Sequence, residues 1–87
     1  MYLNLGARFN QPINNLPKKL KYLIVGMDFN QPLNNLPESL EYLSLFDCWY
    51  FRQSLENLPD NIITLELPCV GITPINKLPK NIKHLIK

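Results

Sequence analysis

Apolar residues recur along the chain in a short pattern, L-x-x-L-x-L, whose second half alternates between apolar and other residues. The complete copies are Leu20, Leu23 and Val25; Leu40, Leu43 and Leu45; and Ile62, Leu65 and Leu67. Partial copies precede and follow them, at Leu3 and Leu5 and at Ile82 and Leu85. Alternation with a period of two is typical of a strand that buries one face. The pattern therefore predicts one short strand for each of its five copies.

A second pattern follows each predicted strand and ends in Leu-Pro. Its copies are FNQPINNLP (9–17), FNQPLNNLP (29–37), FRQSLENLP (51–59) and GITPINKLP (71–79). The Leu-Pro pairs begin at residues 16, 36, 58 and 78, so successive pairs are 20, 22 and 20 residues apart. A fixed period of this size predicts a solenoid. The single domain 1–87 then divides into a half repeat 1–15, repeats 16–35, 36–57 and 58–77, and a half repeat 78–87.

Each repeat returns the chain to the same strand position, so the strands are expected to be parallel, in register and roughly 4.8 Å apart. The segment between strands is too short for much helix and contains proline, for example Pro32 and Pro37. Because proline fixes φ and lacks an N–H, this return leg is expected to be extended or turn-like. The predicted fold class is mainly β, a parallel β-solenoid of about four coils of 20–22 residues with little helix.

Apolar residues of the return legs are expected to close the core opposite the strands. They are Phe9, Phe29 and Phe51; Ile13, Leu33, Leu55 and Ile75; and Leu16, Leu36, Leu58 and Leu78. Gly6 and Gly26 directly follow predicted strands and are expected to bend the backbone with positive φ. Some of the recurring asparagines are expected to satisfy backbone groups at turns between coils rather than to bind a ligand; they are Asn10, Asn14, Asn15, Asn30, Asn34 and Asn35.

The pattern L-x-x-L-x-L after Leu-Pro resembles the strand half of a leucine-rich repeat. The phrase Phe-Asn-Gln-Pro-Ile followed by Asn-Leu-Pro (9–17) resembles the FNIP repeat, a relative of the leucine-rich repeat that is best known from social amoebae and giant viruses. The resemblance covers the whole chain and is strongest in the first two copies. Because FNIP repeats in many members follow an F-box, it implies a substrate-recognition role in an F-box ubiquitin ligase system. No segment of 1–87 is expected to form an F-box itself.

Composition and charge indicate which kinds of partner and which cellular compartment to expect. The chain is 46% hydrophobic, and its eight prolines fall largely at repeat positions, which indicates a folded protein. The formal charge of +2 is too small to favour nucleic acid or a membrane surface as partner. Lys18 and Lys21 align with Glu38 and Glu41 one repeat later, so charges alternate in columns and hold the register. Without a signal-like start or a long apolar run, the protein is expected in the cytoplasm (the host's, if viral), with reduced cysteines at 48 and 69.

Residues between the inward leucines are expected to face solvent on the exposed side of the sheet. One column is Tyr2, Tyr22, Tyr42, Thr64 and His84, and the neighbouring column is Asn4, Ile24, Ser44, Glu66 and Ile86. Stacked tyrosines on a rigid sheet offer an amphipathic contact area, which favours a protein-binding surface. Alternatively, the tyrosines only stabilise each other across the strands. The predicted partner-binding residues are Tyr2, Tyr22, Ile24, Tyr42, Ser44, Thr64, Glu66 and His84, together with Trp49 and Tyr50.

Trp49 and Tyr50 belong to the segment 47–50, where the two extra residues of repeat 36–57 are expected to bulge out of the stack. They are expected either to form an exposed anchor for a partner or to fold back over Phe51. No catalytic, cofactor-binding or metal-binding residues are predicted, because a single histidine and two cysteines make neither a triad nor a zinc set. The predicted function is non-enzymatic recognition of a protein partner through the strand ribbon. The alternative is a structural protein that stacks through uncapped solenoid ends into a homo-oligomer, filament or virion component.

Overall fold

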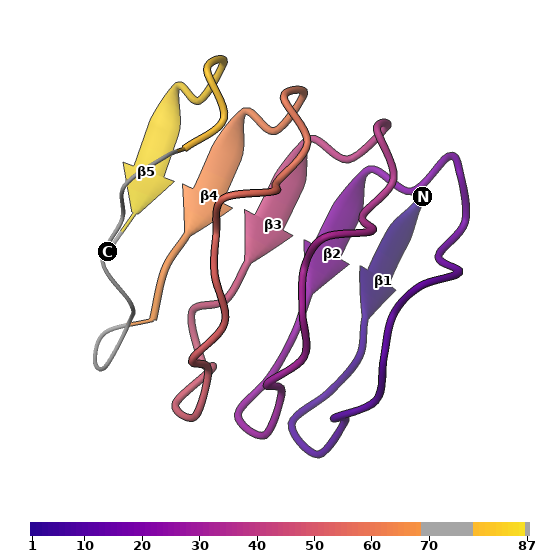
Figure 1. Ribbon diagram of the computed structural model, residues 1–87, viewed down its shortest axis with the longest axis vertical. Coiled ribbons are helices and arrows are strands. Elements are labelled where there is room, and N and C mark those ends of the chain that lie inside the picture. The colour runs from indigo at the N-terminus through magenta and orange to yellow at the C-terminus, as the bar shows by residue number, and fades with distance from the viewer. Residues whose placement is uncertain (69–77, 87) are drawn as a thin grey trace.

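The computed structural model describes residues 1–68 and 78–86, which form a parallel β-solenoid (Figure 1). The strands within these residues are β1 (Tyr2–Asn4), β2 (Tyr22–Ile24), β3 (Tyr42–Ser44), β4 (Thr64–Glu66) and β5 (His84–Ile86). They form one parallel sheet in the order β1-β2-β3-β4-β5. No helix occurs in the described part of the chain, so the predicted fold class is confirmed there.

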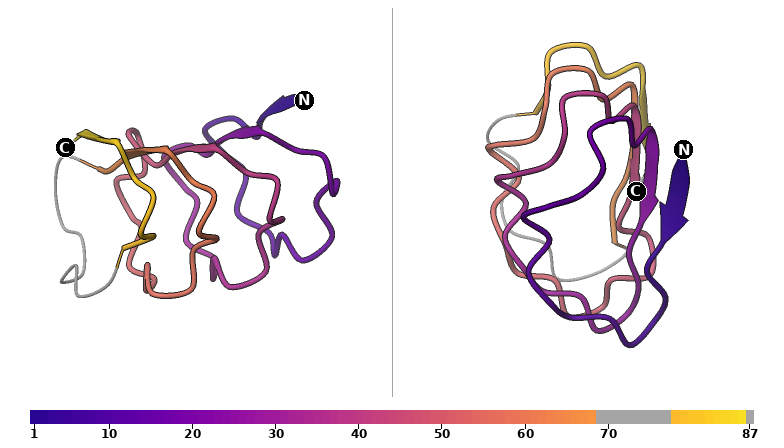
Figure 2. Two further views of the ribbon diagram at one scale, coloured as in Figure 1. Left: turned by 90° about the horizontal axis from the view of Figure 1, so that it is seen from above. Right: turned by 90° about the vertical axis from the view of Figure 1, so that its right-hand side faces the viewer.

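Successive strands pair in register at the positions that the repeat predicts. Tyr2 pairs with Tyr22, Leu23 with Leu43, and Thr64 with His84. The coils consequently have similar outlines, each displaced a little from the one before, when the solenoid is viewed along its axis (Figure 2, right). The interval of 22 residues between β3 and β4 leaves this register unchanged, so the two extra residues are accommodated outside the strands.

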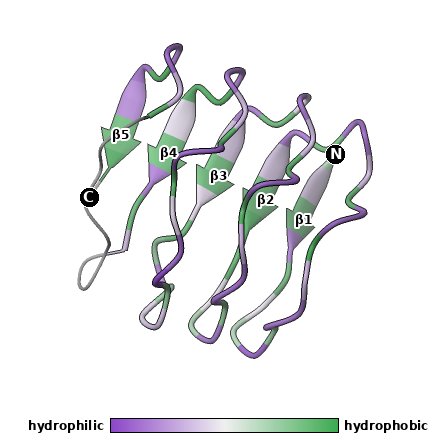
Figure 3. Cartoon of the chain, viewed as in Figure 1, coloured by the Kyte–Doolittle hydropathy of each residue, from purple (hydrophilic) through white to green (hydrophobic). Residues whose placement is uncertain are grey.

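The core is a column of apolar side chains that the strands and the return legs enclose. The predicted inward positions of the three complete strand copies are all buried: Leu20, Leu23, Val25, Leu40, Leu43, Leu45, Ile62, Leu65 and Leu67. Figure 3 shows apolar and polar segments returning at matching places in successive coils. Leu85 of β5 is 39% exposed, because a strand at the edge of the sheet has a neighbour on one side only.

Phenylalanines of the return legs form a second column opposite the sheet. The ring centroids of Phe9 and Phe29 are 6.3 Å apart and those of Phe29 and Phe51 are 6.2 Å apart, with the rings nearly parallel. Ile13, Leu33 and Leu55 are buried beside them, as predicted. Ile75, which the sequence also places in this column, lies outside the described residues.

Asparagine and glutamine side chains connect neighbouring return legs, where the backbones form no sheet. The Oδ1 atom of Asn10 accepts hydrogen bonds from the backbone N–H of Asn30 (2.9 Å) and from Nε2 of Gln31 (2.9 Å). One coil later, Oδ1 of Asn30 accepts from the backbone N–H of Arg52 (2.8 Å) and from Nε2 of Gln53 (3.1 Å). The prediction that these amides satisfy backbone groups is confirmed for Asn10 and Asn30. In each of the first two copies, the sequence Phe-Asn-Gln therefore supplies one aromatic ring to the core and one asparagine that accepts hydrogen bonds from the next coil.

The two glycines that follow strands serve different purposes. Gly6 has a φ of +82°, as predicted. Gly26 does not have a positive φ, so that part of the prediction is wrong. A Cβ atom on Gly26 would instead lie 2.5 Å from the carbonyl oxygen of Gly6 and 2.6 Å from Cα of Ala7. Glycine is needed at residue 26 because the backbones of two adjacent coils approach closely there.

Candidate interaction surface

The predicted tyrosine column lies on the exposed face of the sheet. The ring centroids of Tyr2 and Tyr22 are 6.2 Å apart, and those of Tyr22 and Tyr42 are 5.5 Å apart, both pairs being tilted. Tyr2 is 62% exposed and Tyr22 is 44% exposed, while Tyr42 is half-buried. The geometry supports both readings of the sequence, because the rings contact each other and still present apolar edges to solvent.

Tyr42 is held in place by a charged partner on the next strand. Its hydroxyl donates a hydrogen bond to the carboxylate of Glu66. This hydrogen bond, with burial and the negative charge of Glu66, raises the pKa of Tyr42 to about 12. The hydrogen bond holds the phenol in one orientation, and a fixed side chain loses less entropy when a partner binds.

The second predicted column is only partly available to a partner. Ile24 and Glu66 are half-exposed, and Asn4 and Ile86 are exposed. Ser44, between Ile24 and Glu66 in the register, is 5% exposed. The expectation that Ser44 is accessible is therefore wrong, because a small side chain between two larger ones is covered. Its Oγ atom instead accepts a hydrogen bond from the N–H of Phe46 (3.4 Å).

A hollow that the sequence did not predict adjoins the tyrosine column on the side where the strands begin. It has a volume of about 700 Å³ and is lined by Lys21, Ser39, Glu41, Asn61, Ile63, Lys80, Asn81, Ile82 and Lys83. A smaller hollow of about 260 Å³ continues it along the sheet and is lined by Tyr22, Glu41, Tyr42, Ile63, Thr64 and His84. The two hollows share Glu41 and Ile63, so they form one surface that spans β2 to β5.

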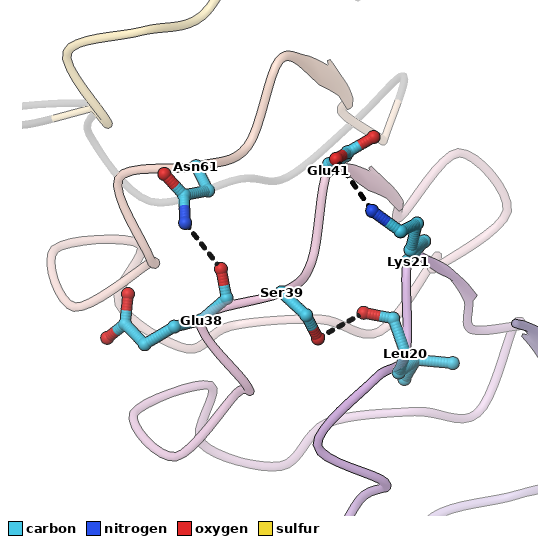
Figure 4. A network of polar contacts seen from close by, with 6 residues as sticks. All are labelled: Leu20, Lys21, Glu38, Ser39, Glu41 and Asn61. Atoms are coloured by element: carbon cyan, nitrogen blue, oxygen red, sulfur yellow. Dashed lines mark hydrogen bonds and ion pairs between the residues drawn. The ribbon is translucent and has the colours of Figure 1, made fainter.

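Hydrogen bonds between coils fix the wall of the larger hollow (Figure 4). Lys21 Nζ lies 3.1 Å from Oε2 of Glu41, which confirms the predicted pairing of these two residues. Ser39 Oγ donates to the carbonyl oxygen of Leu20 (2.6 Å), and Asn61 Nδ2 donates to that of Glu38 (2.7 Å). Each bond links neighbouring coils, so the hollow is preformed by the same contacts that stack them. The prediction that Lys18 and Glu38 pair in the same way is wrong, because these residues form no ion pair among the described residues.

The corner after β3 carries the only tryptophan of the sequence and differs from the prediction. Backbone hydrogen bonds close two successive turns, Leu45 to Cys48 and Cys48 to Phe51, where the preceding coil has a single turn from Gly26 to Phe29. Trp49 and Tyr50 are 53% and 59% exposed, so both rings are accessible to a partner.

The same corner does not bulge outward as a whole. The thiol of Cys48 is fully buried, and burial together with the charge of Asp47 raises its pKa to about 12. Phe46 is 46% exposed and takes part in the additional turn, so it joins Trp49 and Tyr50 as an accessible apolar residue that the sequence pattern did not indicate. Cys48 is a free cysteine, as expected for a reduced thiol, and Cys69 lies outside the described residues.

This surface includes the single histidine of the sequence. His84, at the start of β5, is exposed and lines the smaller hollow beside Thr64 and Tyr42. Within residues 1–68 and 78–86, no cluster of three His, Cys, Asp or Glu side chains is placed to hold a metal ion. The same residues contain no helix that is long and apolar enough to cross a membrane. What the surface offers is a preformed array of aromatic, amide and lysine side chains, which is suited to binding.

Comparison with known proteins identifies the repeat. The family model described as FNIP Repeat matches residues 1–26 and residues 9–48, and these overlapping matches together span more than half of the chain. No curated protein and no solved structure matches the chain.

Proposed function

Since the chain belongs to the FNIP repeat family and folds as a solenoid of stacked coils, we propose that it is a non-enzymatic module that binds a protein partner through the exposed face of its sheet. The observation that carries the proposal is the tyrosine column. Three tyrosines lie in register on adjacent strands, two of them exposed and the third fixed by Glu66. Tyrosine contributes a large contact area with few rotatable bonds, which is the property of residues that dominate binding energy.

The face is also continuous. Tyr22 and Tyr42 of the tyrosine column line the smaller hollow, which adjoins the larger one. Aromatic and polar contacts are therefore available side by side. An apolar centre beside polar groups is the usual arrangement of a protein–protein interface. Substrate capture for an F-box ubiquitin ligase, which the resemblance of the sequence implies, would be one use of this face and stays a hypothesis.

We expect Tyr22→Ala to weaken binding of a peptide selected against the wild-type protein by about 30-fold or more, the loss of roughly 2 kcal/mol that defines a hot spot. Tyr22 is the central ring of the column and contacts Tyr2 and Tyr42. Peptides selected from a displayed random library are the probe, and fluorescence anisotropy measures their affinity for each variant.

The matched control for this test is Tyr50→Ala, which removes an equally large exposed ring from the corner after β3. Unchanged binding in Tyr50→Ala together with a large loss in Tyr22→Ala would assign recognition to the sheet face. The reverse result would assign it to the corner around Trp49 and would overturn the proposal.

Self-association is a second candidate, which an apolar hollow at the first coil favours. This hollow has a volume of about 400 Å³ and is lined mainly by Leu5, Phe9, Pro12, Ile13 and Leu16. Leu5, Phe9 and Leu16 are only partly buried, and an exposed apolar face at a solenoid end can accept another coil. Light scattering after size exclusion tests this use of the surface. A mass that rises with protein concentration would support stacking of copies, and a constant monomer mass would exclude it.

A further inference from the structure

The hollow beside the tyrosine column is rich in lysine and poor in carboxylate. Lys21, Lys80 and Lys83 line it, against the single acidic residue Glu41. Glu41 is already paired with Lys21, at 3.1 Å. Lys80 Nζ lies 3.8 Å from Oδ2 of Asp60, and both side chains are largely exposed, so this pair is weak. The hollow therefore presents a net positive charge.

Of the three lysines that line the hollow, Lys83 is the one without an ion pair among the described residues. Its register neighbour on the preceding coil is Ile63, where the earlier coils have Glu41 beside Lys21. No ion pair involves Lys83 among the described residues. Residues 69–77 and residue 87 include no Asp or Glu, so the acidic side chains of the chain all lie in the described part. The ammonium group of Lys83 is therefore available to pair with a carboxylate of a bound partner.

Two asparagines of the hollow distinguish a peptide from a small anion. Nδ2 of Asn61 donates to the carbonyl oxygen of Glu38, and Nδ2 of Asn81 donates to that of Asp60 (3.0 Å). These bonds orient both amides and leave each Oδ1 atom, to which no described residue donates, as an acceptor at the wall of the hollow. Figure 4 shows Asn61 in this orientation. An acceptor suits the N–H of a peptide backbone and repels a free phosphate or carboxylate.

Resting on the proposed function of the sheet face, we infer that its partner presents an extended acidic segment. One carboxylate of the segment pairs with Lys83, and backbone N–H groups of the segment donate to Oδ1 of Asn61 and Asn81. Ile63 and Ile82, both half-buried in the hollow, contact an apolar residue next to the carboxylate. The tyrosine column contacts the remainder of the segment.

Selection of displayed random peptides against the wild-type protein and against Lys83→Glu tests this inference. We expect wild-type binders to be enriched in Asp and Glu next to apolar residues, and to bind Lys83→Glu about tenfold or more weakly, because a like charge then faces the carboxylate. Lys83→Glu should in turn select peptides enriched in Lys and Arg. The matched control is Arg8→Glu, an equal change of charge at an exposed residue of the corner after β1, away from the hollow. Far-UV circular dichroism checks that both variants remain folded.

The outcomes separate this inference from the proposed function. Binders that lose affinity in Tyr22→Ala but carry no acidic enrichment and ignore Lys83→Glu would overturn the acidic segment and leave the sheet face as the site. Equal losses in Lys83→Glu and Arg8→Glu would show a general effect of net charge and would also overturn it. Binders that ignore both Tyr22→Ala and Lys83→Glu, or a library without binders, would overturn the inference and the proposed function together.

Discussion

Phe29→Ala is expected to lower the free energy of unfolding by about 3–5 kcal/mol, the usual cost of removing a buried aromatic ring. The Phe29 side chain is fully buried between Phe9 and Phe51, so its removal leaves a cavity between two coils. In a solenoid each coil is stabilised by its neighbours. Phe29 is the middle ring of the column, so its removal weakens the packing of its coil against the coils on both sides. A loss of this size is a large part of the stability of a chain of 87 residues.

Urea unfolding monitored by circular dichroism measures this loss, and Phe46→Ala is its matched control. Phe46 is 46% exposed at the corner after β3, so the same substitution removes little buried surface there. A change below about 1 kcal/mol is expected for Phe46→Ala, as for most surface substitutions. Similar losses in the two variants would mean that the phenylalanine column does not hold the coils together.

The fold could be predicted from the sequence because the chain repeats its own pattern. Each copy of L-x-x-L-x-L gives weak evidence for a strand of three residues, but its return every 20 or 22 residues leaves few ways to bury all copies at once. Parallel strands in register are the arrangement that places Leu23, Leu43 and Leu65 in one column. The same logic correctly predicts the phenylalanine column and the tyrosine column.

Features that depend on the distance between coils were not predictable. The reason for glycine at residue 26 is an atom of Gly6 in the preceding coil, which no local pattern reveals. Likewise, Ser44 is covered by its setting between larger neighbours, although its position in the strand predicts exposure. The burial of Cys48 follows from a second turn that two extra residues make possible.

The lysine-lined hollow is the part of the candidate site that could not be predicted from the sequence. The charge columns indicate pairs that hold the register, and Lys21 with Glu41 confirms this interpretation. In the later coils Ile63 replaces the acidic residue, and Lys83 then has no register partner of opposite charge. The sequence does show that an acidic residue is missing from this column beside Lys83. Its importance for binding becomes clear only when the structure places the hollow beside Lys83.

Gly26→Ala is expected to destabilise the protein by about 3 kcal/mol, at the upper end of the usual cost of overpacking. The added Cβ would lie 2.5 Å from the carbonyl oxygen of Gly6 and 2.6 Å from Cα of Ala7. Because these atoms belong to backbone, no side chain can rotate away to relieve the contact. The first two coils must separate locally, which strains the backbone hydrogen bonds that link them, such as that from Asp28 N–H to the carbonyl oxygen of Ala7 (2.9 Å).

Parallel substitutions at Gly6 separate this steric mechanism from a requirement for positive φ. A Cβ atom on Gly6 would meet open space, but the φ of this residue is +82°, so Gly6→Ala is expected to cost about 1–2 kcal/mol. Asparagine tolerates positive φ, so Gly6→Asn should recover part of that loss, whereas Gly26→Asn should be at least as unstable as Gly26→Ala. Urea unfolding of the four variants measures the pattern. Recovery by asparagine at residue 26 would contradict the close approach of the two coils, since a larger side chain cannot relieve a clash between Cβ and backbone.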